Sequence, residues 1–176
     1  MAGKWTIFTL LVGFSTLLAN PVAGAVNTAR IDTVRNEDVL DSGDLQIIDN
    51  FVADAVRELA KTRDFTSIAR IRTVILSRNS SNKGSAQAQY AEQFSESAYK
   101  YIYSGIEQAE LLTPDERKAK VILNLLILID GLEDLRLADL AIGRLKDENM
   151  AVRYWAVHSV TNPGITGQLN STKIAE

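Results

Sequence analysis

The spacing of apolar residues is the feature that most constrains this chain. From Asp44 to Val160 the apolar side chains recur every three or four positions, and no stretch alternates with a period of two. A spacing of three and four places side chains on one face of an α-helix, whereas a half-buried strand needs alternation. We therefore expect an all-α protein made of helical hairpins, either stacked in an array or packed as an irregular helical bundle.

The first hairpin is predicted from two apolar stripes. Residues 47–60 carry one stripe with charged and amide side chains between its members, which is typical of an amphipathic helix. A second stripe, in residues 65–75, follows Asp64, whose short acidic side chain favours the N-cap position. The Ser- and Asn-rich segment 77–87 has little to bury, so we expect it to be the longest internal loop or a flexible linker.

The second half of the chain predicts further helices. Residues 87–112 have aromatic and aliphatic side chains at helical spacing, and their tyrosines are interpreted as packing surface. Thr113-Pro114-Asp115-Glu116 has the order of a capping box with a proline at the first helical position. The stretch 121–129 is apolar on nearly every side and should be surrounded by other helices, although a buried strand is the alternative. Asp130-Gly131 should end this helix, and another is expected over residues 135–145.

A helix–turn–helix pattern occupies Leu137 to Val160. A first helix ends in a leucine and an aspartate, a turn follows, and a valine–arginine pair opens a second helix with spaced alanines. This pattern resembles the HEAT repeat, the two-helix unit of α-solenoids, although Glu148 and Met150 replace the family's turn prolines. The resemblance implies a short HEAT-like α-solenoid with a set of repeat-packing residues. They are Leu145, Asp147, Val152, Arg153, Ala156 and Val160.

Helix geometry predicts the same packing without the family. Asn149 is suited to cap the second helix, after which one face is expected to carry Val152, Trp155 or Ala156, Ser159 and Val160. The small residues should allow another helix to approach closely. Arg153 is expected either to return its guanidinium to Asp147 or the carbonyls of the turn, or to be an ordinary exposed arginine.

The polar tail at residues 161–176 raises the question of what covers the last repeat. A solenoid unit cannot bury its faces alone. The tail, with Pro163 and two glycines, is expected to lie loosely over the repeat or to be disordered. The alternatives are that a second chain covers the exposed face or that the array continues in a longer protein. Before this tail we expect two helical regions, 26–76 and 88–160, which the segment 77–87 separates.

Residues 1–25 have the three parts of a secretory signal peptide. Lys4 is followed by the uncharged run Trp5–Leu18 and by the cleavage pattern Ala23-Gly24-Ala25. An uncleaved membrane helix is the alternative, but the run is shorter than the ~18 to 20 residues that a span needs. We therefore expect cleavage before Val26, export to the periplasm or the extracellular space, and no membrane attachment afterwards.

The composition excludes several classes of partner and chemistry. The chain has a formal charge of −3, a pI near 5.3 and no clear basic cluster, so we expect no binding of nucleic acid. It contains no cysteine, which removes disulfides, thiolate metal sites and thiol nucleophiles.

Catalytic and metal-binding motifs are not found. His158 is the single histidine, so a histidine metal triad would need a second chain, and we interpret it as a surface residue. Asp41-Ser42-Gly43-Asp44 faintly resembles a calcium loop but lacks its spacing and closing glutamate, so helix capping is the preferred interpretation. Asn79 and Asn170 begin N-glycosylation sequons, which matter only in a eukaryotic secretory pathway.

Two classes of function remain. The resemblance implies an exported, non-catalytic scaffold that binds another protein through the surface of the array. In a homo-oligomer, a second copy of the chain would be that partner. The alternative is an enzyme or enzyme subunit, because some proteins with HEAT-like repeats act on or beside a tetrapyrrole or other cofactor. No residue pattern supports this alternative, so we expect no catalytic residues, no metal and no cofactor.

Overall fold

The computed structural model describes residues 26–174, with side chains for residues 26–168, so the predicted leader lies outside the described residues. This part of the chain is helical and contains no strand, which confirms the predicted all-α fold and excludes a strand at residues 121–129. The elements are α1 (Ala29–Val34), α2 (Ser42–Lys61), α3 (Phe65–Leu76), α4 (Gln87–Glu110), α5 (Asp115–Leu132), the 3-10 helix η1 (Leu135–Leu137), α6 (Ala138–Ile142), α7 (Met150–Thr161) and α8 (Pro163–Ile174).

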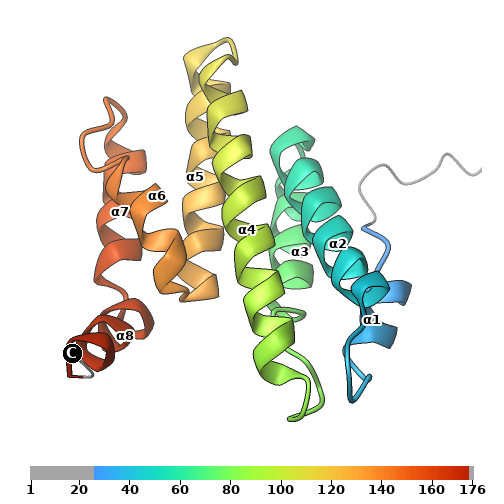
Figure 1. Cartoon of the computed structure of the whole chain (residues 1–176). Helices are drawn as coiled ribbons and strands as arrows, with labels where there is room; N and C mark the ends of the chain where they lie inside the picture. Colours follow the sequence, from blue (N-terminus) through green and yellow to red (C-terminus); the bar gives the residue numbers. More distant parts are fainter. Residues whose placement is uncertain (1–25, 175–176) are drawn as a thin grey trace, which may run out of the picture.

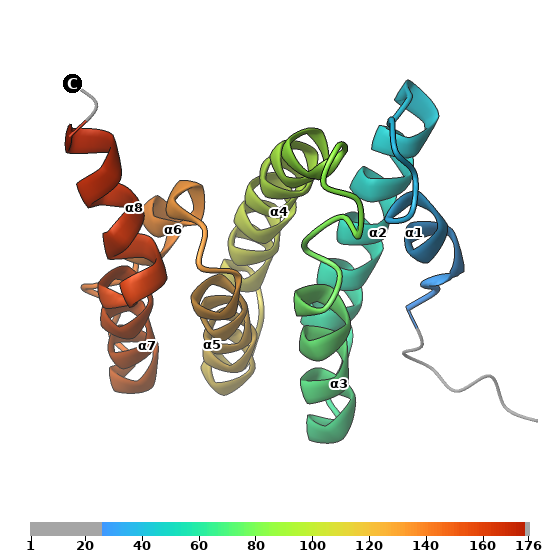
Figure 2. The ribbon, with the colours of Figure 1, turned by 90° about the horizontal axis from the view of Figure 1, so that it is seen from below.

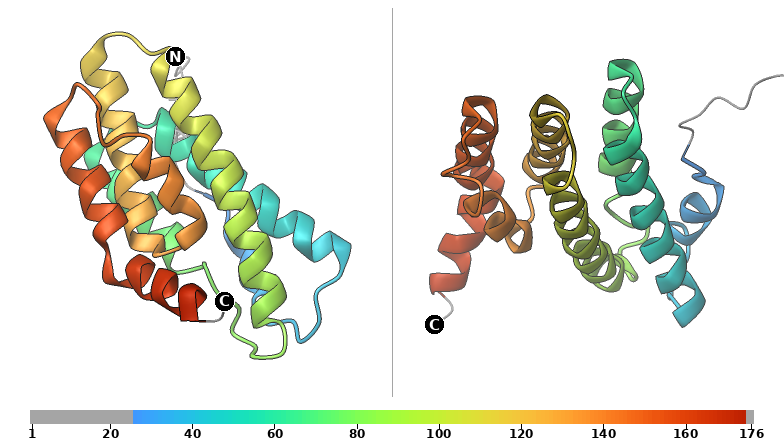
Figure 3. Two further views of the ribbon diagram at one scale, coloured as in Figure 1. Left: turned by 60° about the vertical axis from the view of Figure 1, so that its left-hand side comes forward. Right: turned by 90° about the horizontal axis from the view of Figure 1, so that it is seen from above.

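The hairpins stand side by side in a row. Figure 1 shows α2/α3, α4/α5 and α6/α7 as successive pairs, with α1 at one end and α7 and α8 at the other. Seen from below, α2, α4 and α6 form one layer and α3, α5 and α7 the other (Figure 2). The two views in Figure 3 show the same order, and α8 runs across the end of α7. The hairpins contact one another through α2 and α4 in one layer and through α3, α5 and α7 in the other, and α4 also contacts η1.

Short acidic and amide side chains fix where three helices begin. Asp41 Oδ1 accepts hydrogen bonds from the amides of Gly43 and Asp44, while Asp44 Oδ2 accepts the Asp41 amide. This reciprocal capping box starts α2, so the segment with a faint calcium-loop pattern is a helix cap. Asp64 caps α3 by accepting the Ser67 amide at 2.6 Å, as predicted. Asn149 caps α7 in the same way.

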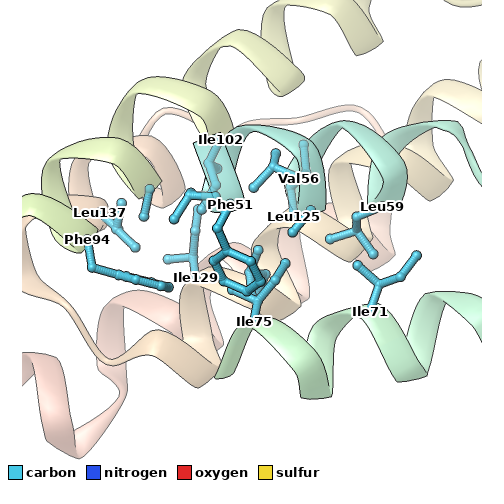
Figure 4. Packing of buried hydrophobic residues seen from close by; sticks show 14 of the residues in the cluster. Phe51, Val56, Leu59, Ile71, Ile75, Phe94, Ile102, Leu125, Ile129 and Leu137 are labelled. Carbon is cyan, nitrogen blue, oxygen red and sulfur yellow. The ribbon is translucent and has the colours of Figure 1, made fainter. Parts of the chain in front are cut away.

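The central helix α5 is surrounded on most sides, as its apolar sequence predicts. Its buried residues join those of α2, α3 and α4 in one core, part of which is shown in Figure 4. A methyl group on Gly131 would lie 2.9 Å from the side chain of Leu76, so this glycine lets α5 pass close to α3. The prediction that Asp130-Gly131 ends the helix is wrong, because α5 continues to Leu132 and ends at Glu133, which has a left-handed φ of 53°.

Two further predictions about helix ends are wrong. The capping box at residues 113–116 does not form, because α5 begins at Asp115 and Pro114 is its N-cap without a side-chain bond. The Pro114 carbonyl accepts the amide of Arg117 instead. The helix expected over residues 135–145 is broken into η1 and the five-residue α6, and turns follow from Gly143. Leu137, Ala138 and Ala141 are the buried residues of this short, partly 3-10 segment.

The C-terminal segment is a helix, although a loose tail was predicted. Pro163 occupies the first helical position, where its missing N–H costs nothing, and Asn162 Oδ1 accepts the Gly164 amide at 2.8 Å. Ile165 is buried and anchors α8. Gln168 adds a bond from its Nε2 to the Glu133 carbonyl. These contacts attach α8 to one edge of the last hairpin.

The segment 77–87 forms the connection between α3 and α4 and is held against α1. Arg35 donates from Nε to the Ser80 carbonyl at 2.8 Å and from Nη2 to Asn82 Oδ1 at 3.0 Å. The amide of Asn82 returns a bond to the Arg35 carbonyl. The loop thus joins α1 to the first hairpin.

Candidate interaction surface

The predicted repeat-packing residues all lie at the last hairpin. Val152 and Ala156 are buried, and Leu145 and Val160 are partly buried against the core. Arg153 donates to the carbonyls of Asp147 and Glu148 at 2.7 and 2.9 Å. Of the two expectations for this arginine, the contact with the turn is therefore the one observed. Asp147 lies beyond α6 and accepts the Asn149 amide through Oδ1, so it shapes the turn.

The seam between α5 and α7 is built from small side chains. Ala156 and Ser159 are fully buried. The Ser159 hydroxyl lies within hydrogen-bond distance of two carbonyl oxygens, that of Leu126 at 3.2 Å and that of Trp155 at 2.8 Å. A small side chain at these positions lets the two backbones approach, as the sequence predicts. The hydroxyl is satisfied inside the seam, which a buried polar group requires.

His158 lies at the edge of this seam and is exposed. Its Nδ1 is 2.8 Å from Asp130 Oδ1, and the side-chain amide of Asn162 donates to the same carboxylate oxygen at 3.0 Å. The arrangement ties the end of α7 to the end of α5. Two side chains, those of His158 and Asn162, thus meet at one carboxylate oxygen of Asp130.

The opposite side of α7 is apolar and exposed. Met150, Tyr154 and Val157 are 76%, 62% and 48% exposed, and Ile142 of α6 is 50% exposed. The spacing of four and three residues aligns the first three on one stripe of the helix, away from Val152 and Ala156. We name Ile142, Met150, Tyr154 and Val157 the open-end face. None of these four side chains carries a charge.

The other end of the array is covered differently. Helix α1 packs beside α2 with Ile31 and Val34 buried. Arg30 and Thr33 of α1 are exposed and polar, as is Glu37 just beyond its end. Solenoid ends normally need such a polar outer surface to stay soluble. The exposed positions of α1 at one end are thus mainly polar, whereas the exposed stripe of α7 at the other end is apolar.

A groove of about 600 Å³ lies between the start of α5 and the turn before α7, and it is lined mainly by charged residues. Its two more buried cations are already paired, because Lys118 Nζ is 2.6 Å from Glu110 Oε2 and Arg144 bonds Glu110 Oε1. The hydrogen bond from Lys118, followed by the effect of Arg144, holds the pKa of Glu110 below its ordinary value. The groove is thus an ion-pair network between hairpins.

Metal-binding and membrane-spanning features are absent from residues 26–174. No group of three or more histidine, cysteine or acidic side chains is placed to hold a metal ion in this part of the chain. Within the same residues, no helix combines the length and hydrophobicity that crossing a bilayer requires.

No family of known proteins matches the chain, and neither the curated proteins nor the solved structures contain a match.

The open-end face was not predicted from the sequence. The prediction for α7 concerned only its buried side, where Val152 and Ala156 have helical spacing. A signal was nevertheless available, because Met150, Tyr154 and Val157 form a second apolar stripe on the same helix. A helix that is apolar on both sides is expected to be covered on both sides.

Proposed function

We propose that this chain is an exported, non-catalytic helical-repeat protein that binds another protein through its open-end face. The observation that carries the proposal is the uncharged stripe of Met150, Tyr154 and Val157 on the last helix of the array. Methionine and aromatic residues are enriched in the buried centre of protein interfaces, where charged residues are depleted. Contiguous exposed apolar side chains on a folded monomer mark interaction sites.

The rigidity of the supporting hairpin favours the same function. The buried side of α7 is fixed by Val152 and Ala156, its start by the Asn149 cap, and its end by the His158–Asp130 contact. A stripe on such a helix is preorganised, so binding costs little conformational entropy. The HEAT-like character that the sequence suggests agrees with this use, since stacked hairpins commonly serve as scaffolds.

The test is affinity capture with a matched pair of variants. Tyr154→Glu places a charge in the open-end face, whereas Tyr103→Glu places the same charge on an exposed tyrosine of α4. We expect a protein partner to be retained by the wild type and by Tyr103→Glu and lost by Tyr154→Glu, with unchanged circular dichroism for both variants. Equal retention by the two variants would place the binding surface elsewhere.

A further inference from the structure

We propose that α1 is a releasable strap, which opens from α2 as one unit while the rest of the array stays folded. A polar clamp holds the strap shut. The clamp consists of Asp32 and Arg35 at α1 and of Arg78, Ser80 and Asn82 in the segment that follows α3. The strap lies at the end of the array opposite α7, where α1 packs beside α2 (Figure 2).

Helix α1 contributes little apolar burial. It has six residues and buries Ile31 and Val34, whereas α2 has 20 residues and buries side chains along most of its length. A helix of six residues is unstable by itself, because its few hydrogen bonds do not offset the cost of nucleation. Segments with few buried apolar side chains open locally before the whole protein unfolds. We therefore expect α1 to be less stable than α2.

The clamp supplies the attachment that the apolar contacts lack. Arg78 donates from Nε and Nη2 to the two carboxylate oxygens of Asp32, at 2.8 and 3.0 Å. At the end of α1, the guanidinium of Arg35 bonds Ser80 and Asn82, and the Arg35 carbonyl accepts the Asn82 amide at 2.8 Å. Hydrogen bonds between charged groups are strong, but 41% of the Asp32 side chain is accessible. Water can therefore replace the partners when the strap opens, and no charge is left buried without a partner.

A hinge connects the strap to α2. Residues 37–39 are exposed and lie outside any helix. Asp38 pairs with Lys83 at 3.8 Å between exposed side chains, a contact that contributes little. Beyond the hinge Leu40 is buried, and the capping box of α2 is formed by Asp41 and the first turn of α2 itself. The chain can therefore turn at residues 37–39 without unfolding α2.

Opening of the strap uncovers the part of the core that Ile31 and Val34 cover. While the strap is closed, this end of the array presents the polar side chains of Arg30 and Thr33. The position of α1 therefore controls whether this end presents a polar or an apolar surface. This control does not depend on the proposed function of the open-end face.

Native-state hydrogen exchange tests the strap through two reporter amides. The Arg35 amide donates to the Ile31 carbonyl at 3.0 Å, and the Asn82 amide donates to Arg35 from the distant loop. If the strap opens as one unit, both amides should show the same opening free energy and protection at least about 100-fold lower than that of the amides in α5. Protection of both amides as high as in α5 would show that α1 opens only with global unfolding, and would overturn the proposal.

Arg78→Met tests the clamp, because it removes the bonds to Asp32 without changing α1 or the residues of the two reporter amides. The protection of both reporter amides should fall at least about tenfold, with the helical circular dichroism retained. Arg57→Met is the matched control, since Arg57 forms a similar bond of 2.6 Å to Asp54 on α2 at an exposed site. It should leave both reporter amides unchanged. Wild-type protection of these amides in Arg78→Met would contradict the clamp.

The absence of native cysteine allows a second test by thiol labelling. Val34 of α1 and Val52 of α2 are 2% and 0% exposed, so a cysteine at either position reacts only after it is uncovered. Under native conditions Val34→Cys should be labelled at least about tenfold faster than Val52→Cys. Equal rates for the two thiols would mean that α1 stays closed until the whole array unfolds, and the strap would be refuted.

Discussion

At the scale of single residues, the two sides of α7 respond differently to substitution. Val152 is 1% exposed in the seam with the rest of the core. An aspartate there buries a carboxylate without a partner, so Val152→Asp should cost about 3 kcal/mol or more in unfolding free energy. Chemical denaturation compared with the wild type measures the loss. An unchanged midpoint would mean that α7 is not packed as described.

His158 provides the matched control on the same helix. Its contact with Asp130 is partly exposed, with 47% of the histidine side chain accessible, and such contacts contribute little to stability. His158→Ala should therefore cost less than about 1 kcal/mol. A loss as large as that of Val152→Asp would show that the histidine supports the seam.

Three carboxylates with lowered pKa values make the free energy of unfolding depend on pH. The pKa of Asp32 is lowered mainly by its hydrogen bonds from Arg78. Burial alone would raise the pKa of Asp49, but hydrogen bonds from Tyr101 and Ser97 and the nearby Lys100 hold it below its ordinary value. The pKa of Glu110 is lowered by its hydrogen bonds from Lys118 and Arg144, as described above.

The sign of the pH effect follows from these lowered values. A carboxyl group whose pKa is lower in the folded state stabilises the protein above its unfolded pKa, and this contribution is lost as the pH falls through the folded pKa. We expect the melting temperature to fall below about pH 4. In Asp49→Asn the fall should be shallower, whereas Asp54→Asn, at an exposed site, should keep the wild-type profile. Identical profiles for Asp49→Asn and the wild type would contradict the role of the Tyr101 bond.

At the scale of elements, the cap of α7 is the most local determinant of the last hairpin. Asn149 Oδ1 accepts the amides of Ala151 and Val152 at 3.0 and 3.3 Å. Asn149→Ala should destabilise the protein by about 1 kcal/mol, and Asn149→Asp should retain most of the stability because aspartate caps equally well. Thermal melts of the two variants check this pair. Equal losses would mean that the side-chain oxygen is not the stabilising group.

The end of α5 offers a substitution that should stabilise. Glu133 has a φ of 53°, a conformation that costs a non-glycine residue about 1 kcal/mol. Glu133→Gly removes this cost but adds unfolded-state entropy, so we expect a gain of up to about 0.5 kcal/mol. A clear loss in urea denaturation would show that the Glu133 side chain, which lies beside Gly164, contributes more than the backbone conformation costs.

The sequence predicts the long helices better than the short ones. The helices α2, α3 and α4 were predicted because each repeats an apolar stripe over three or more turns, and α5 was predicted from the run 121–129, which is apolar on nearly every side. The short α1 was missed, since its position depends on the contact of Arg35 with the distant loop at Ser80 and Asn82. Helix α8 was also missed, because Ile165, the buried residue among its side chains described at 163–168, has little local periodicity around it.

At the scale of the whole molecule, the two ends of the array differ, and this difference gives the protein its candidate site. The local pattern of α7 predicts one buried side, but whether the other side is covered depends on the elements around it. Helix α1 covers one end with polar residues outward, while α8 attaches only to an edge of the other. The sequence contains the second apolar stripe of α7, but only the assembled array shows that this stripe is left exposed.

The measurement that tests the open-end face most directly uses its methionine. The chain has two methionines, Met1 and Met150, so a ¹³C-methyl label on methionine gives a signal from this face that Met150→Leu assigns. A soluble gadolinium chelate broadens methyl signals that solvent reaches. We predict that the chelate strongly broadens the Met150 signal in dilute protein and that this broadening disappears as the complex forms. In Tyr154→Glu the broadening should remain, because the complex does not form. Broadening of the Met150 signal that stays the same in the fully formed complex would contradict the account.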